Sequence, residues 1–296
     1  MSCVRNTRVE RPRTLTVLRT GPQALVQDLG RPGHAHLGVP PSGALDPPSL
    51  TLANRLVGNP EDAACLEVLL GGLALRANAS CTVAVTGPST PTLVNGVLRD
   101  PPLHLAPGDT LVLGTPRGGL RSYVAVSGGI AVPADLGSRA TDLLSGLGPA
   151  PLRPDDELPL GDPTGVPVGV DVLVPRHVPD ELVVPVVPGP RDDWFDDPVR
   201  RLAAGRWTVS ERSNRVGLRL TGTALERTAD RVGRELPSEG LVTGAVQVPA
   251  DGRPVVFLAD HPTTGGYPVI GVVAPEALPL LGQAAPGTRL RFAPRT

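Results

Sequence analysis

The chain has 296 residues, 40% of them hydrophobic, and its 28 basic and 29 acidic side chains leave a net charge of −1. This balance excludes the basic surface that nucleic-acid binding requires, and no apolar run is long enough to cross a membrane. All 28 basic residues are arginines, which excludes a Schiff-base lysine, a lysine general base and a Walker-type phosphate loop.

The cysteines and the N-terminal segment give expectations about the cellular compartment. Cys3, Cys65 and Cys81 are odd in number and widely spaced, so they match neither a disulfide framework nor a zinc-ligand pattern. Residues 1–13 contain four arginines without a following apolar stretch, which favours a disordered tail over a signal peptide. We therefore expect a protein of the reducing cytoplasm.

Short apolar segments separated by glycine, proline, asparagine or aspartate recur through the first half of the chain. Such segments are typical of short β-strands joined by tight turns. The expected extended segments are 15–18, 24–26, 36–39, 64–70, 73–76, 82–86, 92–94, 103–105, 110–113 and 121–126.

One helix is expected in this half, over residues 47–57. Asp46 precedes it as an N-cap and Pro47 occupies its first turn. Gly58 follows as a stop signal, because a glycine readily adopts the left-handed conformation that ends a helix.

The second half repeats the pattern of short strands, with two helical segments at 193–202 and 275–281. Prolines cluster near 175–190, so we expect a first subdomain over residues 14–180 and a second over 181–296. Many strands with few helices favour a mainly β architecture of barrels or sandwiches and disfavour a Rossmann sheet. The expected strands are 171–174, 182–187, 208–209, 217–220, 246–248, 255–258, 269–273 and 288–292.

Two segments of this strand pattern resemble each other. Residues 107–113 and 286–292 both place a proline–glycine turn before a strand. The likeness indicates either an internal duplication or two similar turns before strands.

A polar segment follows the apolar strand 255–258 and is the first candidate site. Its hydroxyl groups and glycine N–H groups can bind a carboxylate or an oxyanion, and its aspartate can orient a reacting group or accept a proton. Its tyrosine is one of only two in the chain. The alternative is a tight turn capped by the aspartate. The candidate catalytic residues are Asp260 and Tyr267, and the candidate substrate-binding residues are Thr263, Thr264, Gly265 and Gly266.

Two further polar segments lie nearby in the chain. Glu239 and Gln247 would face the same pocket if 246–248 is a barrel strand, and the alternative is a solvated loop beside an edge strand. Arg212, Asn214 and Arg215 are candidates for contacts with an anion, because arginine binds carboxylates bidentately. The alternative for these arginines is a salt bridge between strands.

The glycine-rich segment 27–33 contains Asp28 and Arg31, which either pair with each other or hold a polar ligand. The residues alone favour a structural hairpin with an ion pair. His34 and His36 would face one side of a strand, but no third ligand accompanies them, so no metal site is predicted.

Several motifs, in their order and spacing, carry a resemblance to one family over residues 14–294. They are Gln27-Asp28-Leu29-Gly30-Arg31, Asn54-Arg55-Leu56-Val57-Gly58-Asn59, Tyr123-Val124-Ala125-Val126-Ser127-Gly128-Gly129-Ile130, Ser238-Glu239-Gly240 and Thr263-Thr264-Gly265-Gly266-Tyr267-Pro268. Together they resemble the biotin-dependent carboxyltransferase-like family. This family includes the C component of 5-oxoprolinase, the second component of allophanate hydrolase and the carboxyltransferase A–B module of urea carboxylase.

The resemblance implies two cyclophilin-like β-barrel subdomains and an enzyme subunit that is inactive alone. Its partners would be a related B component and a lactam-handling A component, and the complex would use ATP to open 5-oxoproline to glutamate. The family's site residues carry over to Asp260 and to 263–267, with Glu239 and Gln247 nearby. Two positions depart from the family pattern: His261 stands where a basic or amide residue is common, and Val269 stands where a lysine is common.

Two alternatives remain open under this resemblance. One is a carboxyltransferase that acts on urea or a related amide; because the chain has no lysine to carry biotin, carboxybiotin would come in trans. The other is a non-catalytic protein that regulates a kinase-inhibitor system.

Overall fold

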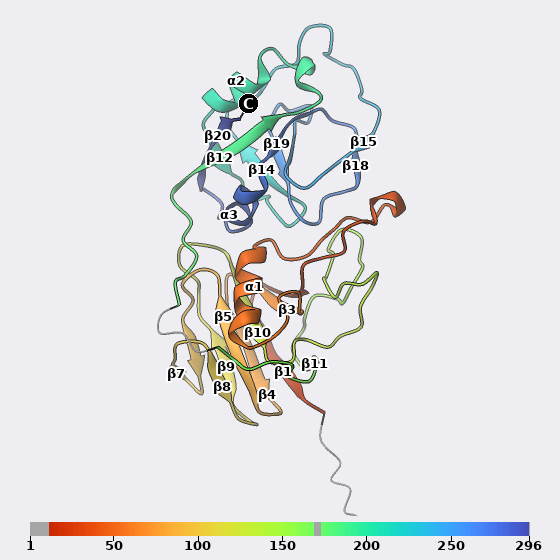
Figure 1. Cartoon of the computed structure of the whole chain (residues 1–296). Helices are drawn as coiled ribbons and strands as arrows, with labels where there is room; N and C mark the ends of the chain where they lie inside the picture. Colours follow the sequence, from red (N-terminus) through yellow and green to blue (C-terminus); the bar gives the residue numbers. More distant parts are fainter. Residues whose placement is uncertain (1–11, 169–172, 296) are drawn as a thin grey trace, which may run out of the picture.

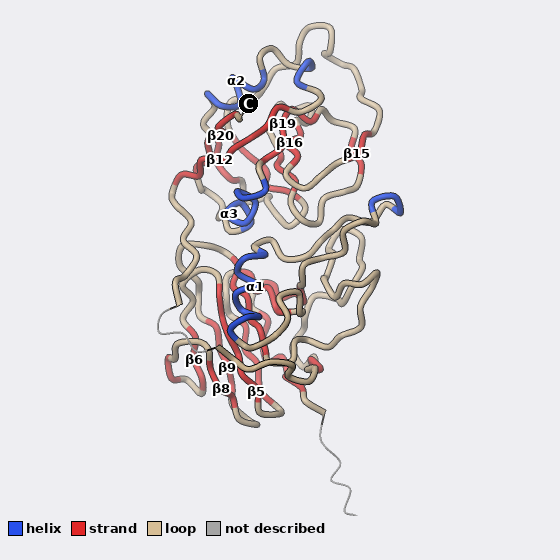
Figure 2. The backbone as a smooth tube through the Cα atoms, viewed as in Figure 1, coloured by secondary structure: helices blue, strands red, loops and turns tan. Residues whose placement is uncertain are grey.

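The computed structural model describes residues 12–168 and 173–295, and it consists of two β units stacked end to end (Figure 1). Figure 2 shows that strands and loops dominate both units and that the helices are short. The expectation of a mainly β protein is therefore confirmed. Among the described residues, no helix has the length and apolar character that crossing a bilayer requires.

The first unit is built from two antiparallel sheets. The six-stranded sheet has the order β11 (Glu157–Pro159), β1 (Thr14–Thr20), β4 (Leu73–Ala77), β9 (Thr110–Leu113), β6 (Thr92–Val94) and β7 (Val97–Leu98). The five-stranded sheet has the order β2 (Gln23–Gln27), β3 (Cys65–Leu69), β10 (Arg121–Val126), β5 (Cys81–Thr86) and β8 (Leu103–Leu105).

An aliphatic core joins the two sheets, and helix α1 (Pro47–Leu56) covers the other face of the five-stranded sheet. Strand β10 is therefore buried along its whole length. The predicted cap is confirmed, since the Asp46 carboxylate accepts a hydrogen bond from the Ser49 backbone N–H. Leu50 and Ala53 of α1 pack towards Tyr123 of β10, which fixes the helix on the sheet.

The second unit is a closed barrel of seven strands around a core that includes Trp207 and Phe292. Beside it lies a separate two-stranded sheet, β15 (Glu239–Gly240) with β18 (Thr264–Gly265). The barrel order is β12 (Glu181–Pro188), β19 (Val269–Val273), β16 (Ala245–Gln247), β17 (Val255–Phe257), β14 (Gly217–Thr221), β13 (Trp207–Val209) and β20 (Arg289–Pro294).

The structure corrects some expectations and leaves others open. Strand pairing closes a barrel only in the second unit; within residues 12–168 the strands form two sheets. The segment 36–39 is not extended, because Ala35–Leu37 form a 3-10 turn, η1, that ends at Gly38 in the left-handed conformation. The proposed boundary at 180 falls one residue before β12. Residues 1–11 of the expected tail and residues 171–172 of the strand expected at 171–174 lie outside the described residues, and 173–174 are not in a strand.

Both helical segments expected in the second half are confirmed, but each consists of a 3-10 turn and a short α-helix. The first is a 3-10 turn, η2 (Asp192–Trp194), followed by α2 (Pro198–Ala204). The second is a 3-10 turn, η3 (Pro275–Ala277), that continues as α3 (Leu278–Gly282). Helix α3 lies at the end of the barrel that faces the first unit (Figure 1).

Candidate functional site

The small sheet β15–β18 brings two predicted site segments together. Glu239 lies opposite Gly265 and Gly240 lies opposite Thr264. The Leu241 N–H extends the pairing by donating to the Thr263 carbonyl at 2.9 Å. The side chain of Thr264 is exposed. The sheet therefore brings the two segments side by side, but neither Glu239 nor Gln247 lines the cavity beside Tyr267.

Gln247 supports this sheet from the neighbouring barrel strand β16. Its buried amide donates to the Tyr267 carbonyl at 3.0 Å. A Cβ atom on Gly265 would lie 2.7 Å from Gln247 Nε2 and 2.8 Å from Leu241 Cδ1. An alanine at position 265 would therefore require the ends of the Gln247 and Leu241 side chains to shift.

Glu239 is paired with Arg191, which follows β12 and precedes η2. Arg191 donates through both Nε and a terminal nitrogen, and the Nε–Oε2 distance is 3.0 Å. The hydrogen bond from Arg191 lowers the pKa of Glu239, so the carboxylate is charged at neutral pH. Sequence reasoning missed Arg191, because nothing in the proline-rich segment 185–190 indicates which carboxylate it meets.

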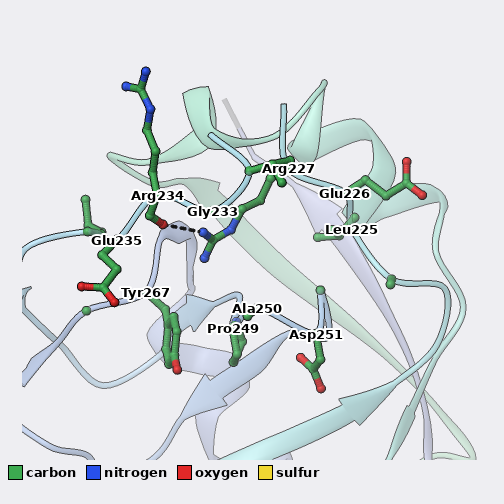
Figure 3. A pocket seen from close by; sticks show the side chains of 15 residues that line it. Leu225, Glu226, Arg227, Gly233, Arg234, Glu235, Pro249, Ala250, Asp251 and Tyr267 are labelled. Carbon is green, nitrogen blue, oxygen red and sulfur yellow. Dashed lines mark hydrogen bonds between the residues drawn. The ribbon is translucent and has the colours of Figure 1, made fainter. Parts of the chain in front are cut away.

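Tyr267 stands at the exposed edge of the sheet and lines a cavity of about 880 Å³ (Figure 3). The cavity is bounded by 224–227, 232–236 and 249–252, and Gly266 completes the wall beside Tyr267. A volume of this size falls in the range of small-molecule sites. The candidate loop therefore borders a space that a small ligand can occupy.

Asp260 lies apart from this surface, at the contact between the two units. Its side chain is fully buried, and Arg215 donates to its two oxygens at 2.8 and 2.9 Å. Ser42 Oγ of the first unit donates at 2.8 Å, and the Leu143 N–H donates at 3.3 Å. Both oxygens of Asp260 accept hydrogen bonds from protein donors, and these bonds connect the two units. The predicted catalytic role of Asp260 stays a prediction.

Arg215 extends this contact into a buried ionic network. Its guanidinium donates to Glu67 Oε1 and to the Gly43 carbonyl, each at 2.6 Å. Glu67 also accepts hydrogen bonds from the Tyr123 hydroxyl at 2.7 Å and from the Leu45 N–H at 3.0 Å. Of the two alternatives for Arg215, the structure shows the ion pair, and it joins the two units.

The charges in this network balance each other electrostatically. Burial opposes ionisation of Glu67, but the positive charges of Arg215 and Arg121 outweigh it and lower the pKa of Glu67. Burial, followed by the charge of Glu67, raises the pKa of the Tyr123 phenol, which stays protonated and donates. Sequence reasoning missed Glu67; the available signal was one carboxylate inside the apolar segment 64–70.

A second polar contact joins the units next to the N-terminus of α1. Gln283, which follows α3, donates to Asp46 Oδ2 at 3.0 Å and to the Arg121 carbonyl at 2.8 Å. Its oxygen accepts from the Arg121 N–H at 2.7 Å. Arg176 pairs with Asp46 at 2.8 Å. The helix cap is therefore also a point of attachment for the barrel.

Asp28 and Arg31 hold a loop of the first unit and do not pair with each other. Asp28 accepts from Ser138 Oγ and from the Arg139 N–H, each at 2.6 Å. Arg31 donates to the Ala140 carbonyl at 2.5 Å. The structure places both residues away from the Tyr267 cavity, on the loop that continues to the Asp260 contact, and their substrate-binding role stays a prediction.

The histidines occupy two different settings. His34 and His36 flank the start of η1, so their expected arrangement on one side of a strand is absent. Within residues 12–168 and 173–295, no group of three or more metal-ligating side chains is gathered. His261 is buried, with Nδ1 2.7 Å from the Pro262 carbonyl, and burial lowers its pKa.

Comparisons with known proteins identify one family. Residues 37–294 match the family described as carboxyltransferase domain, subdomain A and B. The C component of 5-oxoprolinase from Escherichia coli is 38% identical over 287 residues, which cover 94% of this chain and 90% of that protein. Urea amidolyase of Saccharomyces cerevisiae is 31% identical over 310 residues, which cover 96% of this chain and 17% of that protein.

A solved structure shows the same arrangement of both units. The crystal structure of TTHA0988 superposes with a TM-score of 0.86 at 37% identity. The match covers 96% of this chain and 56% of that chain. The present chain therefore spans little more than half the length of that solved protein.

Proposed function

Because this chain belongs to the carboxyltransferase domain, subdomain A and B, family, we propose that it is one subunit of an ATP-dependent 5-oxoprolinase assembly. The assembly opens the lactam of 5-oxoproline to glutamate and works in a reducing cytoplasm, where the free thiols of Cys65 and Cys81 stay reduced. The chain alone does not turn over substrate. A related B component and a lactam-handling A component complete the assembly, which uses ATP as a whole.

The length of the match to the 5-oxoprolinase C component is the observation that carries this proposal. The E. coli protein aligns over 90% of its own length, whereas the yeast urea amidolyase aligns over 17%. This chain therefore matches nearly the whole of a C component but only a small part of urea amidolyase. We assign the further catalytic parts to the A and B components.

The proposed substrate surface is the sheet β15–β18 with the following loop. The hydroxyls of Thr263 and Thr264 and the N–H group of Gly266 are the donors for a carboxylate or amide oxygen. Gly265, whose backbone pairs with Glu239, holds this surface in the small sheet. The exposed Tyr267 phenol contacts the reacting amide. Charged Glu239, held by Arg191, and buried Gln247 keep this surface in place.

Asp260, Asp28 and Arg31 act on this surface from a distance. We assign Asp260 to positioning, because its ion pair with Arg215 fixes the start of the loop that carries residues 263–267. Asp28 and Arg31 hold the segment around 138–140, and the Leu143 N–H further along the same loop donates to Asp260. In this arrangement the three residues orient the substrate surface without contacting the substrate.

The test is reconstitution of the assembly from separately produced polypeptides. This chain is combined with its candidate A and B partners, and glutamate formation from 5-oxoproline is measured with and without ATP. We expect glutamate only when ATP and all three chains are present. Full activity of the two partners without this chain contradicts the proposal.

The match to urea amidolyase over 96% of this chain favours one second candidate, a carboxyltransferase acting on urea or a related amide. Since the chain has no lysine, biotin has to arrive on a partner protein. Avidin blotting of co-purifying proteins, together with a urea-dependent carboxylation assay, tests this candidate. A biotinylated partner and urea carboxylation favour it over the first proposal.

A further inference from the structure

Two arginines line the cavity beside Tyr267, Arg227 and Arg234, and only Arg227 extends its side chain into it (Figure 3). Figure 3 shows the Arg227 side chain extending into the cavity, with Tyr267 on another wall, whereas Arg234 points away from the cavity. Among the described residues, no carboxylate lies within 4.0 Å of the Arg227 guanidinium. Within the same part of the chain, the only hydrogen bond of its side chain runs from NH1 to the Arg234 carbonyl at 2.8 Å.

Arg227 is nevertheless held in a defined place. Its guanidinium lies over the ring of Trp194, 5.1 Å from the ring centre, and Trp194 is itself buried. Its backbone forms a bridge with Phe195, the residue after Trp194. The contact with Trp194 holds the guanidinium in place. Nε is buried without a partner and NH1 donates to Arg234, whereas NH2 has no hydrogen-bond partner among the described residues, so the NH1–NH2 end of the guanidinium can donate to a ligand.

Arg231 provides an internal comparison on the same aromatic ring. Its guanidinium lies 5.3 Å from the centre of the Trp194 ring, but it pairs with Asp193 at 2.7 Å and with Asp230 at 3.3 Å. Arg231 does not line the cavity. The two arginines therefore share one platform, and only the one that faces the cavity lacks an acidic partner among the described residues.

Three acidic residues line the cavity, Glu226, Glu235 and Asp251, and none of them lies within 4.0 Å of the Arg227 guanidinium. Asp251 accepts from the Arg253 N–H at 3.1 Å, and the two side chains lie 3.7 Å apart. Glu226 points away from the cavity in Figure 3. A partly buried guanidinium with free edge donors favours a planar anion as its partner, because a carboxylate accepts two parallel N–H bonds.

We propose that Arg227 binds the carboxylate of a small amide- or lactam-containing acid in this cavity, with Tyr267 contacting the amide end of the same molecule. This inference rests on the proposed function, because it assigns the substrate's carboxylate to a residue outside the candidate loop. Arg227 would then distinguish substrates that carry a carboxylate from neutral amides of the same shape.

The experiment measures binding to the full chain, without turnover. 5-Oxoproline, 2-pyrrolidone (the same lactam without the carboxylate) and inorganic phosphate are titrated by calorimetry and by tryptophan fluorescence, which reports on Trp194 together with Trp207, the other tryptophan of the chain. We expect 5-oxoproline to bind about tenfold or more tightly than 2-pyrrolidone. Arg227→Gln should remove that preference, and Arg231→Gln, the matched control on the same ring, should retain it.

The outcomes separate this inference from the proposed function. Equal binding of 5-oxoproline by the wild type and Arg227→Gln overturns it, as does the absence of 5-oxoproline binding at millimolar concentration. Binding of phosphate in place of 5-oxoproline also overturns it, since the site would then take a phosphoryl group. If the reconstituted assembly forms no glutamate but the Arg227-dependent preference persists, the proposed function fails and the carboxylate site stands.

Discussion

Gly265 packs closely against two side chains beneath the candidate surface. Its absent side chain leaves room for Gln247 and Leu241, and a Cβ atom would approach them to 2.7 and 2.8 Å. We expect Gly265→Ala to displace the Gln247 amide from the Tyr267 carbonyl and to destabilise the chain by about 1 kcal/mol, since the ends of the Gln247 and Leu241 side chains can shift. Activity of the reconstituted assembly should fall with it.

Gly240, on the opposite strand, provides the matched control. A Cβ atom there meets nothing within 4 Å, so Gly240→Ala should change neither the unfolding midpoint nor glutamate formation. Thermal unfolding and the ATP-dependent assay measure both variants. Equal behaviour of the two variants would show that the close packing under Gly265 is unimportant.

For single residues, the sequence predicted neighbours only where they belong to nearby segments of the chain. Glu239 and Gln247 lie against the 264–267 segment, which follows them within a few short strands of the same barrel unit, but the pocket that they were predicted to share does not include them. The partners of Asp260 were not predictable, since Arg215 and Ser42 are separated from it by 45 and 218 positions. A single sequence carries no information on such pairings.

The N-terminus of helix α1 lies at the contact between the two units. The carboxylate of Asp46 caps the helix and accepts from Arg176 and from Gln283 beyond α3. We expect Asp46→Ala to cost more than the ~1 kcal/mol of an ordinary cap, because Arg176 and Gln283 also lose their acceptor. Asp46→Asn, which retains an acceptor, should cost less. Urea unfolding of both variants gives the comparison, and an equal loss for both would contradict this account.

At the scale of elements, several strands match the expected bounds to the residue, namely 92–94, 103–105, 110–113, 121–126 and 269–273. Apolar runs between turn residues define such strands locally. The 3-10 turn η1 was missed because the segment around His36 has no periodic pattern. The closure of one barrel and the two sheets of the other unit depend on long-range pairing, which the local pattern does not encode.

The whole molecule depends on an ionic contact between its units. Removing Arg215 leaves Glu67 and Asp260 buried and without their main cationic partner. We expect Arg215→Gln to destabilise the chain by about 3–5 kcal/mol. Arg212→Gln, three residues earlier on the exposed surface, should stay within about 0.5 kcal/mol of the wild type. Denaturant unfolding measures both, and a loss below about 1 kcal/mol for Arg215→Gln would contradict the importance of the network.

The same contact makes the stability of the molecule depend on pH. The positive charges of Arg215 and Arg121 outweigh burial and hold the pKa of Glu67 below its ordinary value of 4.5 in the folded chain. As the pH falls, the unfolded chain therefore takes up this proton before the folded chain does. The contribution of Glu67 to stability is fully present above pH 4.5 and is lost as the pH falls through the lowered pKa of the folded state.

Glu67→Gln isolates this contribution, because glutamine does not titrate. At neutral pH the variant should be less stable than the wild type, since its amide has to face the Arg215 guanidinium and the hydrogen bonds donated by Tyr123 and Leu45. Below pH 4.5 the difference in unfolding free energy should narrow steadily, because protonation removes the charge from the wild-type carboxylate as well. Unfolding in urea at a series of pH values gives this difference directly. A gap that stays constant to low pH would mean that Glu67 is not the charged centre that holds the two units together.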